Sequence, residues 1–258
     1  MNQSVKKALK LLDLFTEQKS ELTLKEISEM SNIPKPTVYR LLSSLEATHF
    51  LEKTKESTHD SKYRLGIKLL ELGQLVSHQL ELRRTSLPYM EDLMQEISEA
   101  VHLVIVSQDE AIYIEKVESN RALRLYTRIG KRSPLYVGSG PRLLLAFMPD
   151  ERQQQLLHEE EFHFLGNQRP VNRAHLLHTL KVIRKQGYAF SNGEQDADTT
   201  GVSYPIYNHY GQVTAALTVS GLSSRFKDDN LIFIKKRTKK AAKAISIQLG
   251  YRGDVFNE

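Results

Sequence analysis

The chain has 258 residues, with 36 basic and 31 acidic side chains, nine histidines, and neither cysteine nor tryptophan. This length suffices for one large or two modest domains with buried cores, and 40% hydrophobic and 26% charged residues are typical of a globular protein. The lack of cysteine excludes disulfides, thiol nucleophiles and thiolate metal sites. No apolar run reaches the roughly 18 residues of a membrane span, and the amino terminus does not resemble a signal peptide, so we expect a cytoplasmic protein.

The charge is unevenly distributed along the chain. Residues 1–68 carry 12 Lys/Arg and 9 Asp/Glu, residues 69–234 carry 17 and 20, and a basic run, KKRTKKAAK, occupies 235–243. The basic amino-terminal segment indicates a polyanion partner, although a solvated surface would give the same charge. The run at 235–243 could bind DNA or an anionic membrane, but we expect it to be the solvated face of a helix.

The first 50 residues predict three helices. In the first helix an apolar stripe at helical spacing predicts the buried face, formed by Val5, Ala8, Leu9, Leu12 and Phe15. Thr23 and Glu26 have the spacing of a capping box that begins a second helix, which ends at a turn over 31–33. Pro34 and Pro36 fit only the first turn of a third helix. This third helix is predicted to bury Val38, Leu41, Leu42 and Leu45.

The third helix and the segment after it predict a winged helix-turn-helix. Strands beginning at Phe50 and Tyr63 enclose a polar loop over 53–62. The exposed start and polar face of the helix suit the DNA major groove, and are formed by Lys35, Pro36, Thr37, Tyr39, Arg40, Ser43 and Ser44. The cations of the wing suit backbone phosphates, and are Lys53, Lys55, Lys62 and Arg64. Arg40 is the expected reader of a base or phosphate, the alternatives being a plain surface arginine or a module that binds protein.

Residues 66–98 predict a nearly continuous helix that Pro88 interrupts. Such a helix commonly links a DNA-binding module to a regulatory one and pairs two copies of a chain. We therefore expect a DNA-binding domain over 1–66, a linker helix over 67–84 and a second domain over 85–258.

The second domain alternates strand and helix patterns. Strands are predicted at 101–108, 111–119, 122–130, 188–191, 203–208 and 212–220. Helices are predicted near 140–158, 173–186 and 228–249. This order indicates an α+β domain with a mainly antiparallel sheet flanked by helices.

Segments spread over nearly the whole chain carry a family resemblance, and they are SVKKALKLLDLF, TLKEISEMSNIPKPTVYRLLSSLEATHFLEK, YRLGIKLLELG, AIYIEKVESNRALRLYTRIGKRSPLYVGSGPRLLLAF, GYAFSNGEQ, YPIYNHYGQVTAALTVSG and AAKAISIQLG. In their sequence and order they resemble the IclR family of bacterial transcriptional regulators. The resemblance implies either a homodimer or a dimer of dimers, which is a homotetramer, that binds a palindromic double-stranded operator. It also implies a carboxy-terminal effector-binding domain that senses a small metabolite, often an organic acid or an aromatic catabolite.

The predicted effector pocket centres on Gly138, Ser139 and Gly140, which lead directly into a helix. The free N–H groups of a helix start attract an anion, although an ordinary strand-to-helix turn would have the same sequence. Arg142 follows, either as a partner for a ligand carboxylate or as a surface residue.

By resemblance, two further strands contribute to this pocket. Thr218 and Ser220 share one face by period-two alternation, and Gly201 and Ser203 supply another wall. The family commonly has a cysteine in a run close to Gly201, whereas this chain reads DADTTGVSYP.

The sequence gives little support for a metal site or for an enzyme. The pairs His158 with His163 and His175 with His178 lack a fixed third ligand, so we expect solvated histidines, no metal and no cofactor. The sequence motifs of serine hydrolases, P-loop NTPases and dinucleotide enzymes are absent. We expect an effector-controlled repressor of a catabolic or transport operon, the alternative being a small-molecule-binding enzyme with an accessory winged helix.

Overall fold

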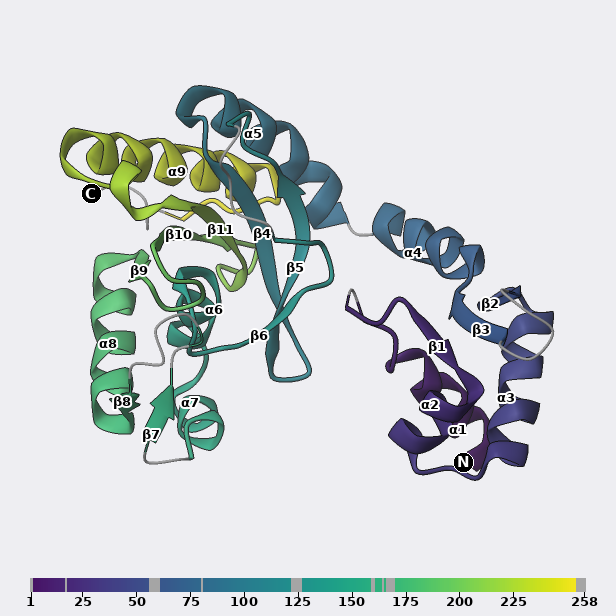
Figure 1. Ribbon diagram of the computed structural model, residues 1–258. Helices are drawn as coiled ribbons and strands as arrows, with labels where there is room; N and C mark the ends of the chain where they lie inside the picture. The colour runs from purple at the N-terminus through teal and green to yellow at the C-terminus, as the bar shows by residue number, and fades with distance from the viewer. Residues whose placement is uncertain are drawn as a thin grey trace. The chain divides into compact units, whose positions relative to one another are not determined.

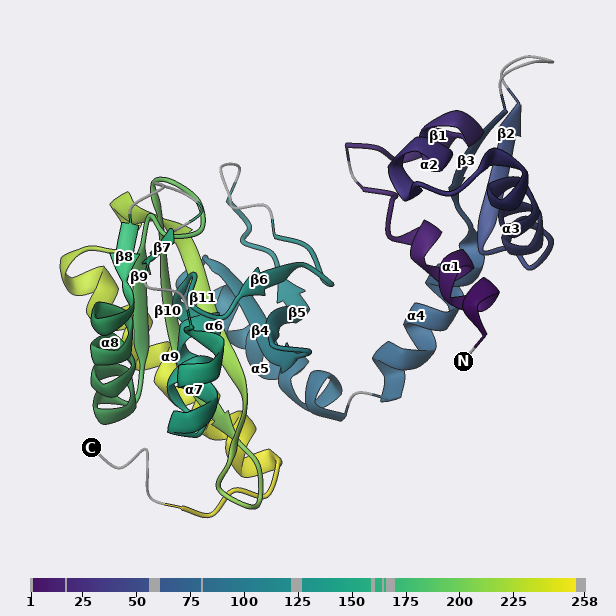
Figure 2. The same cartoon turned by 90° about the horizontal axis from the view of Figure 1, so that it is seen from below.

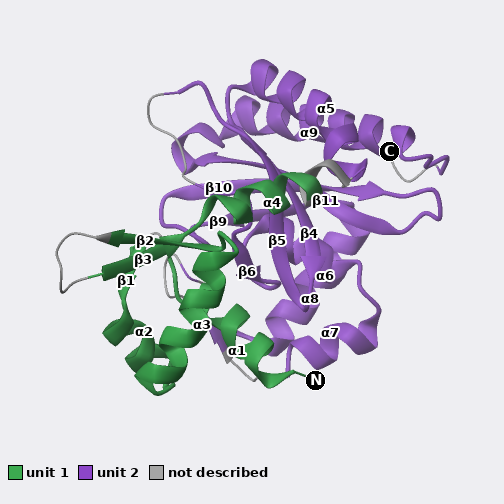
Figure 3. Ribbon diagram, turned by 90° about the vertical axis from the view of Figure 1, so that its right-hand side faces the viewer, with its two compact units in different colours: residues 1–80 green, residues 81–258 purple. Residues whose placement is uncertain are grey.

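The chain forms two compact units, residues 1–80 and 81–258 (Figure 3). The computed structural model describes residues 2–16, 18–55, 61–79, 81–121, 127–158, 161–163, 165 and 170–253, with the backbone alone at 55, 76–79 and 161.

Unit 1 packs helices against a small antiparallel sheet of order β1-β3-β2 (Figures 1 and 2). Its elements are α1 (Gln3–Leu12), β1 (Glu21–Thr23), α2 (Leu24–Ser31), α3 (Lys35–Ala47), β2 (Leu51–Lys55), β3 (Ser61–Leu65) and α4 (Ile67–Gln79). The buried core side chains are Leu11, Phe15, Leu22, Ile27, Val38, Leu42, Leu45, Leu51 and Tyr63. The sequence did not predict β1, whose three residues are too few to show alternation.

The ends of α2 follow the predicted local chemistry. The hydroxyl of Thr23 accepts a hydrogen bond from the Glu26 N–H at 3.3 Å, and the Glu26 carboxylate accepts one from the Thr23 N–H at 2.8 Å. This confirms the capping box. Asn32 ends the helix in the left-handed conformation, with φ of 53°, which a short polar side chain tolerates.

The predicted buried stripe of α1 is wrong at two positions. Val5 and Leu9 are 54% and 52% exposed, whereas Leu11 is buried. The apolar residues of this helix cover a wide sector, and periodicity alone does not say which part of that sector faces the core. In the third helix Leu41 is only half-buried, although it packs against the same core.

Unit 2 contains a six-stranded sheet of order β6-β5-β4-β11-β10-β9, in which all neighbours are antiparallel. The elements of this sheet and its helices are α5 (Glu81–Ile97), β4 (Ala100–Ser107), β5 (Glu110–Val117), β6 (Arg132–Pro134), α6 (Ser139–Ala146), α7 (Asp150–Leu156), α8 (Arg173–Gln186), β9 (Ala189–Asn192), β10 (Thr199–Tyr207), β11 (Val213–Leu222) and α9 (Asp228–Gln248). A 3-10 turn, η1, covers Ser223–Arg225, and a two-stranded ribbon pairs β7 (Glu161–His163) with β8 (Pro170–Asn172).

Helices cover both faces of this sheet (Figures 1 and 2). Alternate residues of the strands belong to different cores: Leu103 and Leu217 pack with α5 and α9, whereas Val104 and Ala216 pack with α6 and α8. The mixed fold of helices and antiparallel sheet therefore agrees with the predicted α+β class.

Pro88 does not interrupt the helix as predicted, because it lies inside α5. A proline there removes one backbone hydrogen bond. Burial of Met90, Leu93 and Ile97 against the sheet keeps the helix continuous past it.

Two other predicted boundaries are also wrong. No strand covers 127–130; the next one is β6, and 122–126 lie outside the described residues. The helix predicted near 140–158 is two helices, because Pro149 can begin α7 but cannot continue α6.

Candidate nucleic-acid interface and ligand pocket

The residues predicted to read DNA lie mainly on α3. Pro34 is the N-cap, Pro36 lies in the first turn, and no side chain caps the helix. Val38 and Leu42 are fully buried, which turns the opposite side outward. Of the predicted α3 positions, Thr37 and Ser43 are half-buried and the others are exposed, namely Lys35, Pro36, Tyr39, Arg40 and Ser44. Among the described residues we find no ion pair to Lys35 or Arg40.

The wing cations divide between the two faces of the small sheet. Arg64 donates two hydrogen bonds to Glu52, at 2.9 and 2.7 Å, and Lys62 lies 3.9 Å from Glu21. The Arg64 hydrogen bond holds the pKa of the Glu52 carboxyl below its usual value. Lys53 pairs with Tyr63 in the sheet register and so lies on the other face. The side chain of Lys55 is outside the described residues.

A hollow of about 380 Å³ lies between α2, α3 and the wing. It is lined by Thr23, Leu24, Lys25, Lys35, Tyr39, Lys53, Ser61 and Tyr63. Lys25 was not among the residues predicted to contact DNA. Its position two residues after the Thr23 cap could have indicated that it lies at the start of α2.

One pocket of unit 2, the α6 pocket, lies where the start of α6 crosses the sheet. His102, Thr218 and Ser203 form a row across β4, β11 and β10, and Ser220 and Gly201 form the next row. The volume is only about 30 Å³, roughly the share of one water molecule. Its lining residues are His102, Tyr113, Thr127, Gly138, Ser139, Gly140, Ser191, Glu194, Gln195, Asp196, Thr199, Thr200, Gly201, Thr218 and Ser220.

Three hydroxyls form a buried chain behind this pocket. The Ser203 hydroxyl donates to Ser139 at 2.8 Å, and it lies 2.8 Å from the Thr218 hydroxyl. A hydroxyl has one hydrogen, so Thr218 then donates to Ser203. Glycines allow this approach: a Cβ on Gly140 would lie 2.5 Å from the Thr218 hydroxyl, and one on Gly201 would lie 2.5 Å from that of Ser139.

Two ring side chains, His102 and Tyr113, complete the wall on β4 and β5. His102 Nε2 lies 2.9 Å from the Ser220 hydroxyl, while its buried Nδ1 has no hydrogen-bond partner among the described residues. Burial, with a smaller contribution from nearby lysines, lowers the pKa of His102 to about 3. Tyr113 donates to Gln195 at 3.1 Å, and burial raises its pKa to about 12. Both rings are therefore neutral near pH 7, and His102 is too weak a base for catalysis there.

A carboxylate of the protein lies at the start of α6. Glu194 accepts a hydrogen bond from the Gly138 N–H at 3.1 Å and pairs with Arg142 at 2.7 Å. Both side chains of this ion pair are buried, so the prediction of Arg142 as a surface residue is wrong. Its carboxylate partner is part of the chain.

The comparisons with known proteins agree with this architecture. The profile of the IclR helix-turn-helix domain matches residues 4–55, and that of the bacterial transcriptional regulator IclR C-terminal domain matches residues 74–247. The chain belongs to the IclR family.

Relatives of this IclR-family protein include the HTH-type transcriptional regulator KipR of Bacillus subtilis (strain 168), which is 38% identical over 97% of this chain and 98% of its own length. The crystal structure of the Thermotoga maritima IclR is 29% identical, with a TM-score of 0.76, over 96% of this chain and 99% of that one. An IclR homologue from Microbacterium hydrocarbonoxydans, complexed with 4-hydroxybenzoate, shares the fold at 24% identity and a TM-score of 0.83, over 96% and 99%. The named curated relatives are transcriptional regulators, so this family member is a regulator and not an enzyme.

Most residues predicted for the pocket of this IclR-family protein line it: Gly138, Ser139, Gly140, Gly201, Thr218 and Ser220. Ser203 lies behind them in the hydroxyl chain. The prediction missed His102 and Tyr113, although a histidine inside the apolar run VHLVIV was a signal of a buried polar group that needs a partner. Glu194 had no comparable signal, because its contacts arise only in the folded chain.

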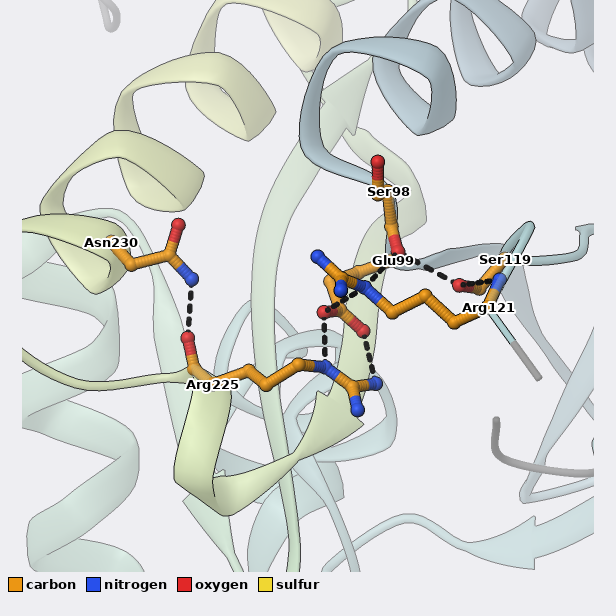
Figure 4. Close-up of polar contacts among 6 residues, drawn as sticks. All are labelled: Ser98, Glu99, Ser119, Arg121, Arg225 and Asn230. Atoms are coloured by element: carbon orange, nitrogen blue, oxygen red, sulfur yellow. Dashed lines mark hydrogen bonds and ion pairs between the residues drawn. The ribbon is translucent and has the colours of Figure 1, made fainter. Parts of the chain in front are cut away.

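A second buried carboxylate, Glu99, lies at the start of β4 (Figure 4). Arg225 donates to it through Nε at 2.5 Å and through a terminal nitrogen at 2.7 Å, and Arg121 lies at 3.4 Å. Ser119 donates to the Ser98 carbonyl at 2.7 Å, and Asn230 donates to the Arg225 carbonyl. Glu99 thus ties β4 to both η1 and the segment after β5.

Across the described part of the chain, no helix is long and apolar enough to span a membrane. The same part holds no group of three or more His, Asp or Glu side chains placed to bind a metal ion.

Proposed function

We propose that this protein is an effector-controlled regulator that binds a specific DNA operator. The observation that carries the proposal is the pairing, in one chain, of an exposed basic α3 with a separate polar pocket at the start of α6. The first feature is suited to a DNA duplex and the second to a small molecule.

For DNA, the proposal places α3 in the major groove. Arg40 would reach a base edge, while Lys35 and Lys53 would contact phosphates. Lys62 and Arg64 already pair with acids, so we expect weaker contributions from them. Tyr39, 51% exposed, would contact sugar, phosphate or a thymine methyl group.

The regulator would act as a homodimer or a dimer of dimers on a palindromic site, because paired recognition helices read paired half-sites. Support comes from α4, on which Ile67, Leu70 and Leu75 are each more than half exposed. Exposed apolar side chains of this kind on a surface helix favour pairing with a second copy.

The effector would bind in the α6 pocket through Ser139, Thr218 and Ser220, and through the N–H groups at the helix start that Glu194 leaves unbound. An organic acid matches those donors, and 4-hydroxybenzoate, bound by one structural neighbour, is a suitable first probe. An effector that binds one arrangement of the pocket better than another shifts the DNA-binding equilibrium.

We further propose that the protein acts in the cytoplasm as a repressor of a catabolic or transport operon.

The test is a gel-shift titration on the DNA upstream of the gene, over a range of salt concentrations. We expect a saturable complex with a steep salt dependence that unrelated duplexes do not compete away. Equal affinity for every duplex would overturn the proposal. Addition of 4-hydroxybenzoate and a panel of other small acids then tests the effector.

A further inference from the structure

The hollow of unit 1 brings together three elements that are separate in the sequence. Lys25 lies in the first turn of α2, Lys35 begins α3, and Lys53 comes from β2 of the wing. Tyr39, one turn along α3 from Lys35, and Tyr63 of β3 complete its walls. Helix α2 packs against α3, and α3 packs against β2 (Figure 1). This packing brings the five residues around one space.

The charge of the hollow is one-sided. Three lysines and no acid are found among its described lining residues. Among the described acids, Glu26 caps α2 through Thr23 and Glu21 lies beside Lys62. Burial, with a smaller contribution from Glu46, raises the pKa of Tyr63, so one carboxylate of α3 lies near this wall. Lys53 holds its ammonium 5.9 Å from the Tyr63 ring centre. Such a cluster of like charges repels itself and is stabilised by a bound anion.

The shape and donors of the hollow match a phosphodiester. The lysines come from three different elements, and Tyr39 adds a phenol. In the first turn of α3, Pro34 and Pro36 have no N–H and Thr37 N–H donates to the Pro34 carbonyl, so the Lys35 N–H is the backbone donor that this turn leaves to an anion. A volume of about 380 Å³ exceeds that of one phosphate and leaves room for the adjoining sugar.

We propose that this hollow clamps a single backbone phosphate of the DNA, and that Lys25 is a DNA-contacting residue. This inference rests on the proposed DNA binding and adds to it a fixed anchor outside the base-reading face. Lys35 and Lys53 grip the same phosphate, so the wing and both helices of the motif meet at one point on the DNA strand. Such a contact sets the register of α3 on the duplex and carries no sequence information.

The first experiment compares salt dependence by fluorescence anisotropy on the operator duplex. One phosphate contact contributes about 0.9 to the slope of log affinity against log salt, or about fourfold in affinity at 0.2 M salt. A variant with Lys25→Gln, Lys35→Gln and Lys53→Gln should therefore lose about 0.9 in slope for each bound subunit, or about 1.8 for a dimer on both half-sites. A loss of about 5.4 for the dimer would mean three separate contacts per subunit, and no loss would mean an empty hollow; either result overturns the clamp.

The single substitution Lys25→Gln should weaken binding to specific and unrelated duplexes by the same factor, leaving sequence preference unchanged. The matched control is Lys7→Gln, which removes an equal charge from an exposed position on α1, and it should bind like wild type. If Lys25→Gln also binds like wild type, or if Lys7→Gln weakens binding as much, the assignment of Lys25 is wrong. Melting temperatures of all variants check that unit 1 remains folded.

A second experiment removes the charge from the DNA instead. Duplexes carrying one methylphosphonate at successive positions should include one position in each half-site that weakens wild-type binding and leaves the triple variant unaffected. Absence of such a position overturns the inference. Failure of wild type to prefer its operator would instead reject the proposed function, so the two failures are distinguishable. Competition by inorganic phosphate below 10 mM, at constant ionic strength, would show a free-anion site and also overturn the clamp.

Discussion

His102 shows how burial determines the charge of a side chain in the pocket. Its ring is 1% exposed, its Nε2 lies against Ser220, and its pKa of about 3 leaves it uncharged. A neutral imidazole can donate from one nitrogen and accept at the other. His102 therefore holds the Ser220 hydroxyl of the pocket without adding a charge.

The same pKa predicts how stability changes with pH. In the unfolded chain the ring titrates near 6.5, so between that pH and about 3 only the unfolded state takes up the proton. The contribution to the free energy of unfolding is complete above about pH 6.5 and decreases by up to about 1.4 kcal/mol per pH unit below it. Urea unfolding of wild type and of a His102→Asn variant measures this contribution of His102 to the free energy of unfolding. The variant should show a flatter decline from about pH 6.5 to pH 5; parallel curves would contradict the burial of a neutral ring.

The prediction about base reading concerns Arg40. If its guanidinium contacts a base edge, Arg40→Ala should weaken operator binding by roughly 1–3 kcal/mol and relax the preference at one base pair. Anisotropy titrations on operators substituted at each position measure both effects. A uniform weakening on all duplexes would show that Arg40 contacts only phosphate.

At the scale of elements, the Glu99 cluster joins three parts of unit 2 (Figure 4). Arg225 is one-fifth exposed and pairs closely with a fully buried carboxylate, whereas Arg121 is half exposed and more distant. Removing the closer partner leaves a buried charge with poor compensation.

Arg225→Ala should therefore lower the free energy of unfolding by roughly 3 kcal/mol, and Arg121→Ala by about 1 kcal/mol or less. Both variants delete one guanidinium from the same carboxylate, so each serves as the control for the other. Chemical denaturation followed by circular dichroism gives the comparison. Equal losses in the free energy of unfolding would show that the burial of the Arg225–Glu99 ion pair does not determine its contribution to stability.

The elements that the sequence predicts well are those defined by local chemistry. The Thr23–Glu26 cap and the prolines at the start of α3 act within a few residues, and both appear as expected. Pro88 and the α1 stripe failed because packing decides them: the sheet holds α5 continuous, and the core selects Leu11 over Leu9. Such tertiary effects have no local signature.

At the scale of the whole molecule, the two sites should be separable by mutation. Ser139→Ala removes a hydroxyl that lines the pocket, and it lies in a different unit from α3. The variant should bind the operator with wild-type affinity but lose most of the effector response, a coupling that is typically 1–3 kcal/mol. Titration of the operator with and without effector measures this coupling. Arg40→Ala should show the opposite defect, which is weakened operator binding with the effector response retained. Loss of both activities in Ser139→Ala would instead indicate misfolding.

For the molecule as a whole, charge by segment and motif order were enough to indicate the fold class and the family. Only part of the pocket could be predicted. Its glycines and hydroxyls lie in short contiguous motifs, whereas His102, Tyr113 and Glu194 reach the pocket only through the pairing of strands and through a loop. Lys25 likewise meets Lys53 only when the wing folds back on α2. Residues brought together by pairing of distant strands cannot be grouped from spacing alone.

The small volume of the α6 pocket has a consequence for the proposed effector binding. With space for about one water, the pocket would accept a metabolite only in the fraction of molecules in which it has opened. The concentration at which the protein responds would then be the intrinsic dissociation constant divided by that fraction. Packing among Ser139, Ser203 and Thr218 would set this threshold, so changes there can retune sensitivity while every ligand contact stays the same.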